Sequence, residues 1–80
     1  MKTCRDMLRE FRVSKGITQT HVAKMTGKDP KRISALETGE IALKGDELLD
    51  IIINGFGVSP AYFFTLELSE NEITAPTTPS

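Results

Sequence analysis

The chain has 80 residues, enough for one small domain, of which 39% are hydrophobic and 26% are charged. No apolar run approaches the roughly 20 residues that cross a bilayer, and charges interrupt the start where a signal peptide is apolar. We therefore expect a cytoplasmic protein with no membrane partner. The single cysteine and single histidine leave no disulfide and no ligand cluster, so we expect neither a metal nor a cofactor.

Charge divides the chain into two parts. All ten Lys and Arg lie between Lys2 and Lys44, with five acids in that span, so residues 1–44 carry a charge of +5. Residues 45–80 carry six acids and no base. A basic half can meet nucleic-acid phosphates while an acidic half faces away or meets a partner. An ordinary mixed surface is the alternative, and charge alone does not separate the two.

The first predicted helix begins after Thr3, a good N-cap, with Asp6 near its positive end. Gly16 ends it, because glycine readily takes the left-handed conformation that follows a last helical turn. Its apolar stripe is Met7, Leu8 and Phe11.

Two short helices follow at residues 19–26 and 30–38, separated by a tight turn. Apolar residues stand where two crossing helices must touch, at Val22, Ala23, Ile33 and Leu36. The expected N-caps are Thr18 and Asp29, and Pro30 suits the first position of the later helix. Gly27 and Gly39 are expected to end the two helices.

After a loop at residues 40–45, Asp46 is expected to cap a fourth helix that Asn54 and Gly55 close. Pro60 opens a short fifth helix. We expect the folded domain to cover residues 1–66, and residues 67–80 to form a disordered acidic tail rich in Thr and Pro.

The spacing of several residues is shared with a known family. They are Gly16-Ile17-Thr18-Gln19, Val22-Ala23, Gly27, Ile33-Ser34, Glu37 and Gly39, followed by Phe56-Gly57-Val58-Ser59-Pro60 with Tyr62-Phe63. This set resembles the helix-turn-helix domain of Cro and phage repressors, the xenobiotic-response-element family, over residues 5–64. The resemblance implies an all-α fold, a compact five-helix lambda-repressor-like DNA-binding domain with its helix-turn-helix at the second and third helices.

The same resemblance implies roles for residues outside the third helix. Arg12 and Glu37 match positions that pair between the first and third helices, and a bidentate bond would fix the angle of the reading helix. Two independent surface charges are the alternative. Gln19 matches a position that contacts a phosphate at the start of the second helix, where free backbone N–H groups also point. A solvated side chain is the alternative for Gln19.

In the third helix, the resemblance places Pro30, Lys31 and Ala35 opposite the DNA bases, with Arg32 at the flank and able to reach a base. Lys31 is the main donor, to guanine O6 or N7, and Ala35 offers a methyl group to thymine. The residues expected to contact phosphates are Gln19, Thr18, Lys28, Ser34, Thr38 and Lys44. A solvated charged helix face is the alternative.

The acidic half holds more apolar side chains than a small core needs. Three consecutive isoleucines at 51–53 cannot all face the core from one helix. We expect part of the surplus to form a dimer interface, at Ile51, Phe56, Tyr62, Phe63 and Phe64. A compact core with scattered exposed apolar residues is the alternative.

These observations predict a small sequence-specific DNA-binding transcriptional regulator, a phage, prophage or mobile-element repressor. It would bind a palindromic operator in double-stranded DNA as a homodimer and would take no small molecule. The alternative is a protein-interaction module of the same fold, an antitoxin or antirepressor that binds another regulatory protein. An enzyme is not expected, because the chain has no glycine-rich phosphate loop and no cluster of carboxylates in a plausible pocket.

Overall fold

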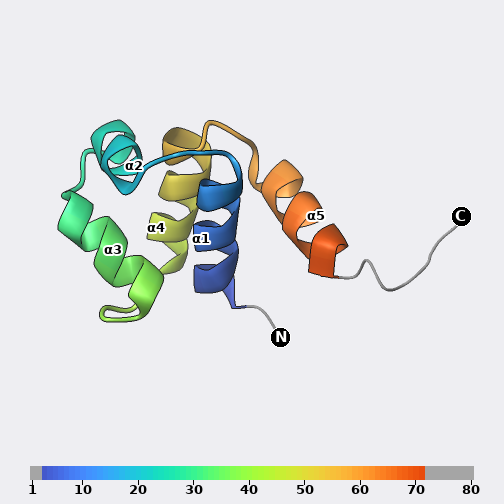
Figure 1. Cartoon of the computed structure of the whole chain (residues 1–80), viewed down its shortest axis with the longest axis horizontal. Helices are drawn as coiled ribbons and strands as arrows, with labels where there is room; N and C mark the ends of the chain where they lie inside the picture. Colours follow the sequence, from blue (N-terminus) through green and yellow to red (C-terminus); the bar gives the residue numbers. More distant parts are fainter. Residues whose placement is uncertain (1–2, 72–80) are drawn as a thin grey trace, which may run out of the picture.

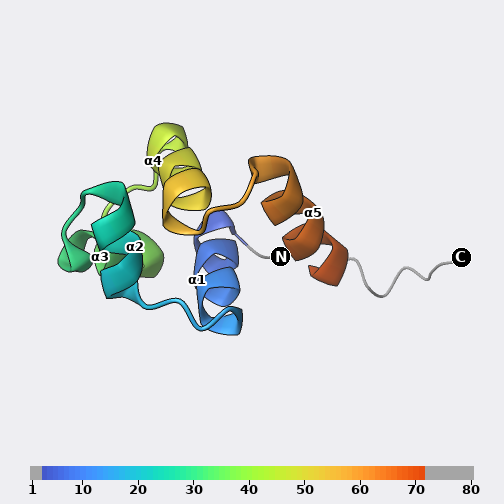
Figure 2. The ribbon, with the colours of Figure 1, turned by 90° about the horizontal axis from the view of Figure 1, so that it is seen from above.

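The computed structural model describes residues 3–71, with side chains described through residue 67. The elements are α1 (Cys4–Ser14), α2 (Gln19–Thr26), α3 (Pro30–Thr38), α4 (Gly45–Asp50), the π-helical turn η1 (Ile51–Gly55) that continues α4, and α5 (Pro60–Asn71). No strand occurs within residues 3–71, so the predicted all-α class is confirmed. Figures 1 and 2 show α3 and α5 at opposite ends of the molecule, with α1 and α4 between them.

The start of α1 follows directly from two polar side chains. Thr3 accepts a hydrogen bond from the backbone N–H of Asp6 at 3.1 Å, and the Asp6 carboxylate accepts one from the backbone N–H of Thr3 at 3.3 Å. This reciprocal capping box satisfies two helix-start donors and fixes where the helix begins. The apolar stripe then turns inward, and Met7, Leu8 and Phe11 are all buried.

The predicted boundaries of α2 and α3 are present in the structure. Asp29 accepts a hydrogen bond from the backbone N–H of Lys31 at 2.8 Å, and Pro30 takes the first helical position, where its missing N–H leaves no bond unmade. Gly27 ends α2 with φ of 71°, a left-handed conformation that favours glycine. α2 and α3 pack on each other through Val22, Ala23, Ile33 and Leu36, which belong to the buried core.

The start of α4 differs from the prediction. Asp46 is not the N-cap: the helix begins at Gly45, and Lys44 stands in the cap position without a side-chain cap bond. Asp46 instead lies in the first turn, where its carboxylate accepts from the backbone N–H of Glu47 at 2.9 Å. A carboxylate is stabilised in either place by the positive end of the helix, so composition alone does not fix the register.

The π-helical turn η1 was not predicted from the sequence. It inserts an extra residue into the helical turn, with the backbone N–H of Phe56 bonded to the carbonyl of Ile51 at 2.8 Å. In this turn Ile51 and Ile52 are both buried, while Ile53 is 48% exposed. Gly55 is buried at the same place, and a Cβ added there would lie 3.0 Å from Cγ1 of Val22. The absence of a side chain at residue 55 therefore lets α2 approach η1 closely.

An aromatic cluster attaches α5 to the rest of the domain. The Phe11 ring stacks on Phe56 with centroids 4.8 Å apart, and its centroid lies 5.3 Å from that of Phe63. The prediction that Ile51 and Phe63 belong to a dimer interface is wrong, because both are buried in the core of the single chain. Phe56 and Phe64 are half-buried against the same core, and Tyr62 is exposed.

Helix α5 continues past residue 66, where we expected the folded domain to end. Glu67 is buried, and the helix runs to Asn71, since no glycine or proline occurs between Ala61 and Asn71 to interrupt it. The rest of the predicted disordered tail, residues 72–80, lies outside the described residues. In the described chain no single helix is long and apolar enough to cross a membrane; only the pair 45–55 and 60–67 reaches that length jointly, with a bend of 96°.

Candidate nucleic-acid interface

The N-terminal half of α3 is the most open part of the helix-turn-helix. Pro30, Lys31 and Arg32 are all exposed, at the end of the molecule farthest from α5 (Figure 1). The side chain of Lys31 makes no hydrogen bond or ion pair within residues 3–67, and the bond to Asp29 is donated by the backbone N–H of Lys31. Its ammonium is thus free to donate to an incoming ligand, such as a base edge.

Ala35 is less accessible than its predicted role requires. It is only 9% exposed, so the prediction that its methyl group packs on a thymine is not supported by its position.

Arg32 is exposed but is not free. Its Nε donates to Oε2 of Glu47 at 2.8 Å, and Nη2 donates to the same oxygen. The Arg32 side chain is 49% exposed, whereas that of Glu47 is 12% exposed. The other carboxylate oxygen of Glu47, Oε1, is buried and has no hydrogen-bond partner. Glu47 therefore holds Arg32 from the protein side, and sequence reasoning missed this contact between α3 and α4.

Lys28 is also held by an acid of the second half. Its Nζ lies 3.2 Å from Oδ2 of Asp50, and its side chain is only 18% exposed. The phosphate contact predicted for Lys28 would have to compete with this ion pair. The hydrogen bond that Asn54 donates to Asp50 at 2.7 Å lowers the pKa of Asp50 below 3.8, and Lys28 lowers it further.

The orientation of α3 is fixed by a buried network. Arg12 donates to both carboxylate oxygens of Glu37, from Nε to Oε2 at 2.7 Å and from Nη2 to Oε1 at 3.1 Å, so the expected pair is present. Gln19 also donates from Nε2 to Oε1 of Glu37 at 3.1 Å. Since Glu37 is 8% exposed, one nearly buried carboxylate on α3 receives bonds from α1 and α2. The part played by Gln19 was not predicted.

The remaining predicted phosphate contacts surround this end of the molecule. Thr18 caps α2 by accepting from the backbone N–H of His21 at 3.0 Å. Thr38 is exposed and donates to the carbonyl of Ala35 at 3.3 Å, Lys44 is exposed, and Ser34 is half-buried. None of these placements prevents a contact to phosphate, and none demonstrates one.

Arg5 is a structural residue that sequence reasoning missed. Its Nε donates to the carbonyl of Leu36 at 2.8 Å, in the last turn of α3. The guanidinium also lies beside Gly39, 3.6 Å from where a Cβ would stand. A cation at this end satisfies a free carbonyl and the negative pole of the helix. The two residues are 31 positions apart, so no local spacing reveals the contact.

Comparison with known proteins gives a family match. The family profile described as helix-turn-helix matches residues 8–63, which run from the middle of α1 into α5. No curated protein and no solved structure matches the chain. The matched range includes every residue described above as a possible DNA contact and both pairs that hold Lys28 and Arg32.

Proposed function

Because the chain belongs to the helix-turn-helix family of the Cro and phage-repressor type, which is non-enzymatic and binds DNA, we propose that it is a sequence-specific transcriptional regulator. The N-terminal half of α3 enters the major groove of double-stranded DNA, as recognition helices of this type do. Lys31 donates to guanine O6 or N7, and Pro30 lies at the helix start where the groove edge approaches.

The observation that carries this proposal is the combination of a free Lys31 and a rigidly held α3. The exposed lysine supplies a donor without a competing partner in the described chain. The bonds of Arg12 and Gln19 to Glu37 join α1, α2 and α3. A reading helix discriminates bases only if its angle to the groove is fixed, and a bidentate pair supplies that constraint.

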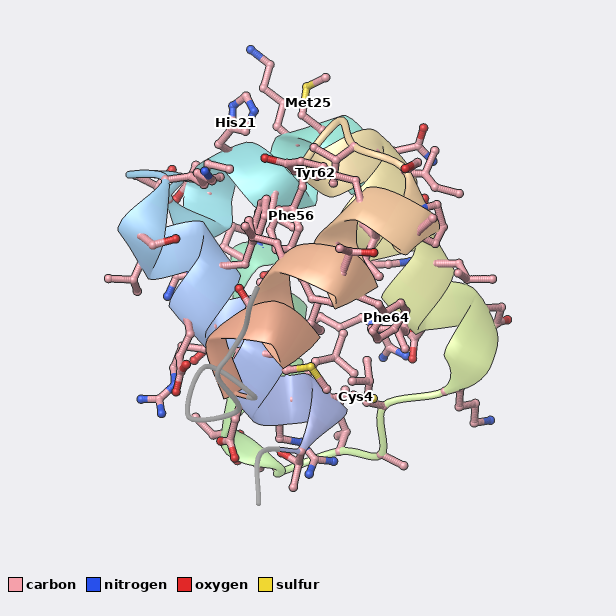
Figure 3. All side chains as sticks on the ribbon, turned by 90° about the vertical axis from the view of Figure 1, so that its right-hand side faces the viewer. Cys4, His21, Met25, Phe56, Tyr62 and Phe64 are labelled. Carbon is pink, nitrogen blue, oxygen red and sulfur yellow. The ribbon has the colours of Figure 1, made fainter. Side chains whose placement is uncertain are left out.

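The same proposal includes the mode of regulation and the symmetry of DNA binding. We assign the protein as a cytoplasmic repressor of phage, prophage or mobile-element type, acting as a homodimer on a palindromic operator. One recognition helix reads few base pairs, and two copies on half-sites about 34 Å apart supply the remaining affinity. Tyr62, one of the predicted interface residues, is exposed, and so are the large apolar side chains of Val13, Met25, Leu49 and Ile53. Figure 3 shows Tyr62 and Met25 in the upper part of the view that faces α5. Phe56 and Phe64 are half-buried against the core and contribute their exposed surface to the proposed dimer contact.

The direct test compares three variants on the duplex that the wild-type protein enriches from random DNA. Lys31→Ala should weaken binding by about tenfold to a hundredfold, because a specific base contact contributes roughly 1–3 kcal/mol. Lys44→Ala removes an exposed lysine predicted to contact a phosphate, and should weaken binding to every duplex similarly, because a phosphate contact carries no sequence information. Lys24→Ala removes another exposed lysine, on α2, and should change affinity by less than about twofold. Equal effects of Lys31→Ala and Lys24→Ala would contradict the assignment of α3.

A second function is favoured by the engagement of Lys28 and Arg32 with Asp50 and Glu47. With these cations neutralised internally, the same fold suits an antitoxin or antirepressor that binds another regulatory protein. Salt separates the two functions, since DNA binding weakens steeply with salt in proportion to the phosphates neutralised. An interface built on apolar contacts responds little.

A further inference from the structure

Acids from one segment hold two of the three cations in residues 28–32, Lys28 and Arg32 but not Lys31. Glu47 in α4 pairs with Arg32, and Asp50, one turn later, pairs with Lys28. In the sequence Lys28 lies three residues before Lys31, and Arg32 directly follows it. The acidic half therefore reaches into the basic half at the place where binding is proposed.

The geometry at Glu47 explains why Arg32 stays in place. Both donors of Arg32 converge on Oε2, while Oε1 is buried without a partner. If Arg32 moved to a phosphate, a carboxylate that is 12% exposed would lose its only ion-pair partner in the described chain. Leaving a largely buried charge unpaired is costly, so the pair resists exchange with phosphate.

The same pair leaves part of the guanidinium available. An arginine carries five N–H donors in a rigid plane, and Arg32 uses one from Nε and one from Nη2. The Nη1 side remains, on a side chain that is half exposed. Glu47 thus holds the remaining N–H donors of Arg32 in a fixed position, and the pair of side chains carries a net charge close to zero.

From this we infer that Glu47 is a specificity-determining positioning residue: it directs Arg32 toward a base edge and withholds it from phosphates. The inference rests on the proposed DNA binding. Sequence-independent affinity depends on the number of phosphates neutralised, whereas base readout depends on donor geometry. Holding Arg32 against Glu47 therefore lowers the sequence-independent affinity and preserves base readout.

The test uses fluorescence anisotropy with a random-sequence 20-base-pair duplex between 50 and 200 mM NaCl. Glu47→Gln removes the charge and keeps the shape. Asp46→Asn is the matched control, because it makes the same charge change one residue away at an exposed acid, and keeps the oxygen that bonds the backbone of Glu47. Circular dichroism establishes that both variants are folded.

We expect Glu47→Gln to bind the random duplex more tightly, with a salt slope steeper by about 0.9, the value for one additional phosphate. This corresponds to about a 3.5-fold larger loss of affinity over that fourfold change in salt. Asp46→Asn should keep the wild-type slope. On the duplex enriched by the wild-type protein, Glu47→Gln should gain less, so its ratio of specific to random affinity should fall.

A double variant shows whether the effect of Glu47→Gln depends on Arg32. In Arg32→Gln the further change Glu47→Gln should no longer steepen the slope, because the released cation is absent. Equal slopes for Glu47→Gln and Asp46→Asn, or an undiminished effect of Glu47→Gln without Arg32, would overturn the inference while leaving DNA binding intact. Failure of all variants and the wild type to bind any duplex at 50 mM NaCl would overturn both the inference and the proposed function.

Discussion

The substitution Glu37→Gln tests whether the buried network sets the stability and aim of α3. Glu37 is 8% exposed and accepts three hydrogen bonds, two from Arg12 and one from Gln19. Removing its charge leaves the Arg12 guanidinium, whose side chain is 14% exposed, without a carboxylate. Breaking a buried pair from one side costs roughly 3–5 kcal/mol. The lower end applies here, because Arg12 keeps its 2.9 Å bond to the carbonyl of Ile17.

A loss of about 3 kcal/mol should lower the thermal midpoint by roughly 12–24 °C in a domain of this size. Urea unfolding followed by circular dichroism measures the free energy directly. Glu40→Gln is the control, since Glu40 is exposed and its substitution should change stability by less than about 0.5 kcal/mol. A loss below about 1 kcal/mol in Glu37→Gln, or equal losses in the two variants, would refute the network as a main determinant.

Two further predictions concern stability. Gly55→Ala should destabilise the fold by about 1–3 kcal/mol, because the new Cβ lies 3.0 Å from Val22, whereas Gly45→Ala meets no atom within 4 Å and should be neutral or stabilising by about 0.5–1 kcal/mol in urea unfolding. The pKa of Asp50 is lowered from 3.8, chiefly by the hydrogen bond from Asn54 and then by Lys28, so its carboxylate stabilises the fold above its unfolded pKa. That contribution is lost as the pH falls below 3.8 through the folded pKa; Asp50→Asn should be less stable than wild type at pH 7, and the difference should shrink toward pH 2. A difference independent of pH would contradict this.

The elements that the sequence predicts correctly are those with a local signal. Thr3 with Asp6, and Asp29 with Pro30, mark helix starts because capping is a contact between near neighbours. Gly27 marks a helix end because few other residues tolerate its backbone conformation. The family resemblance adds the pairing of Arg12 with Glu37, which are 25 positions apart.

The features that the sequence does not predict depend on packing between distant segments. The π-helical turn is associated with the close approach of Gly55 to Val22, and the pattern of three consecutive isoleucines does not indicate an added residue in the turn. The apparent surplus of apolar side chains predicts Ile51 at an interface, but the core of the single chain takes it up.

In the candidate site too, the sequence predicts the local feature and misses the contacts between distant segments. Lys31 is exposed as expected, but the partners of its neighbours come from a helix that sequence reasoning treated as a separate acidic region. The charge asymmetry between the two halves is visible in the sequence, but the pairing of Arg32 with Glu47, 15 positions away, is not. Long-range ion pairs of this kind have no fixed spacing along a chain.

The central claim is that α3 of this protein reads DNA sequence. Selection of bound duplexes from a random pool by the wild-type protein, at a salt concentration near physiological, tests it most directly. The account predicts enrichment of one palindrome whose half-sites are separated by about one helical turn, with loss of enrichment in Lys31→Ala. Recovery of no preferred sequence, or of the same sequence with Lys31→Ala, would contradict it.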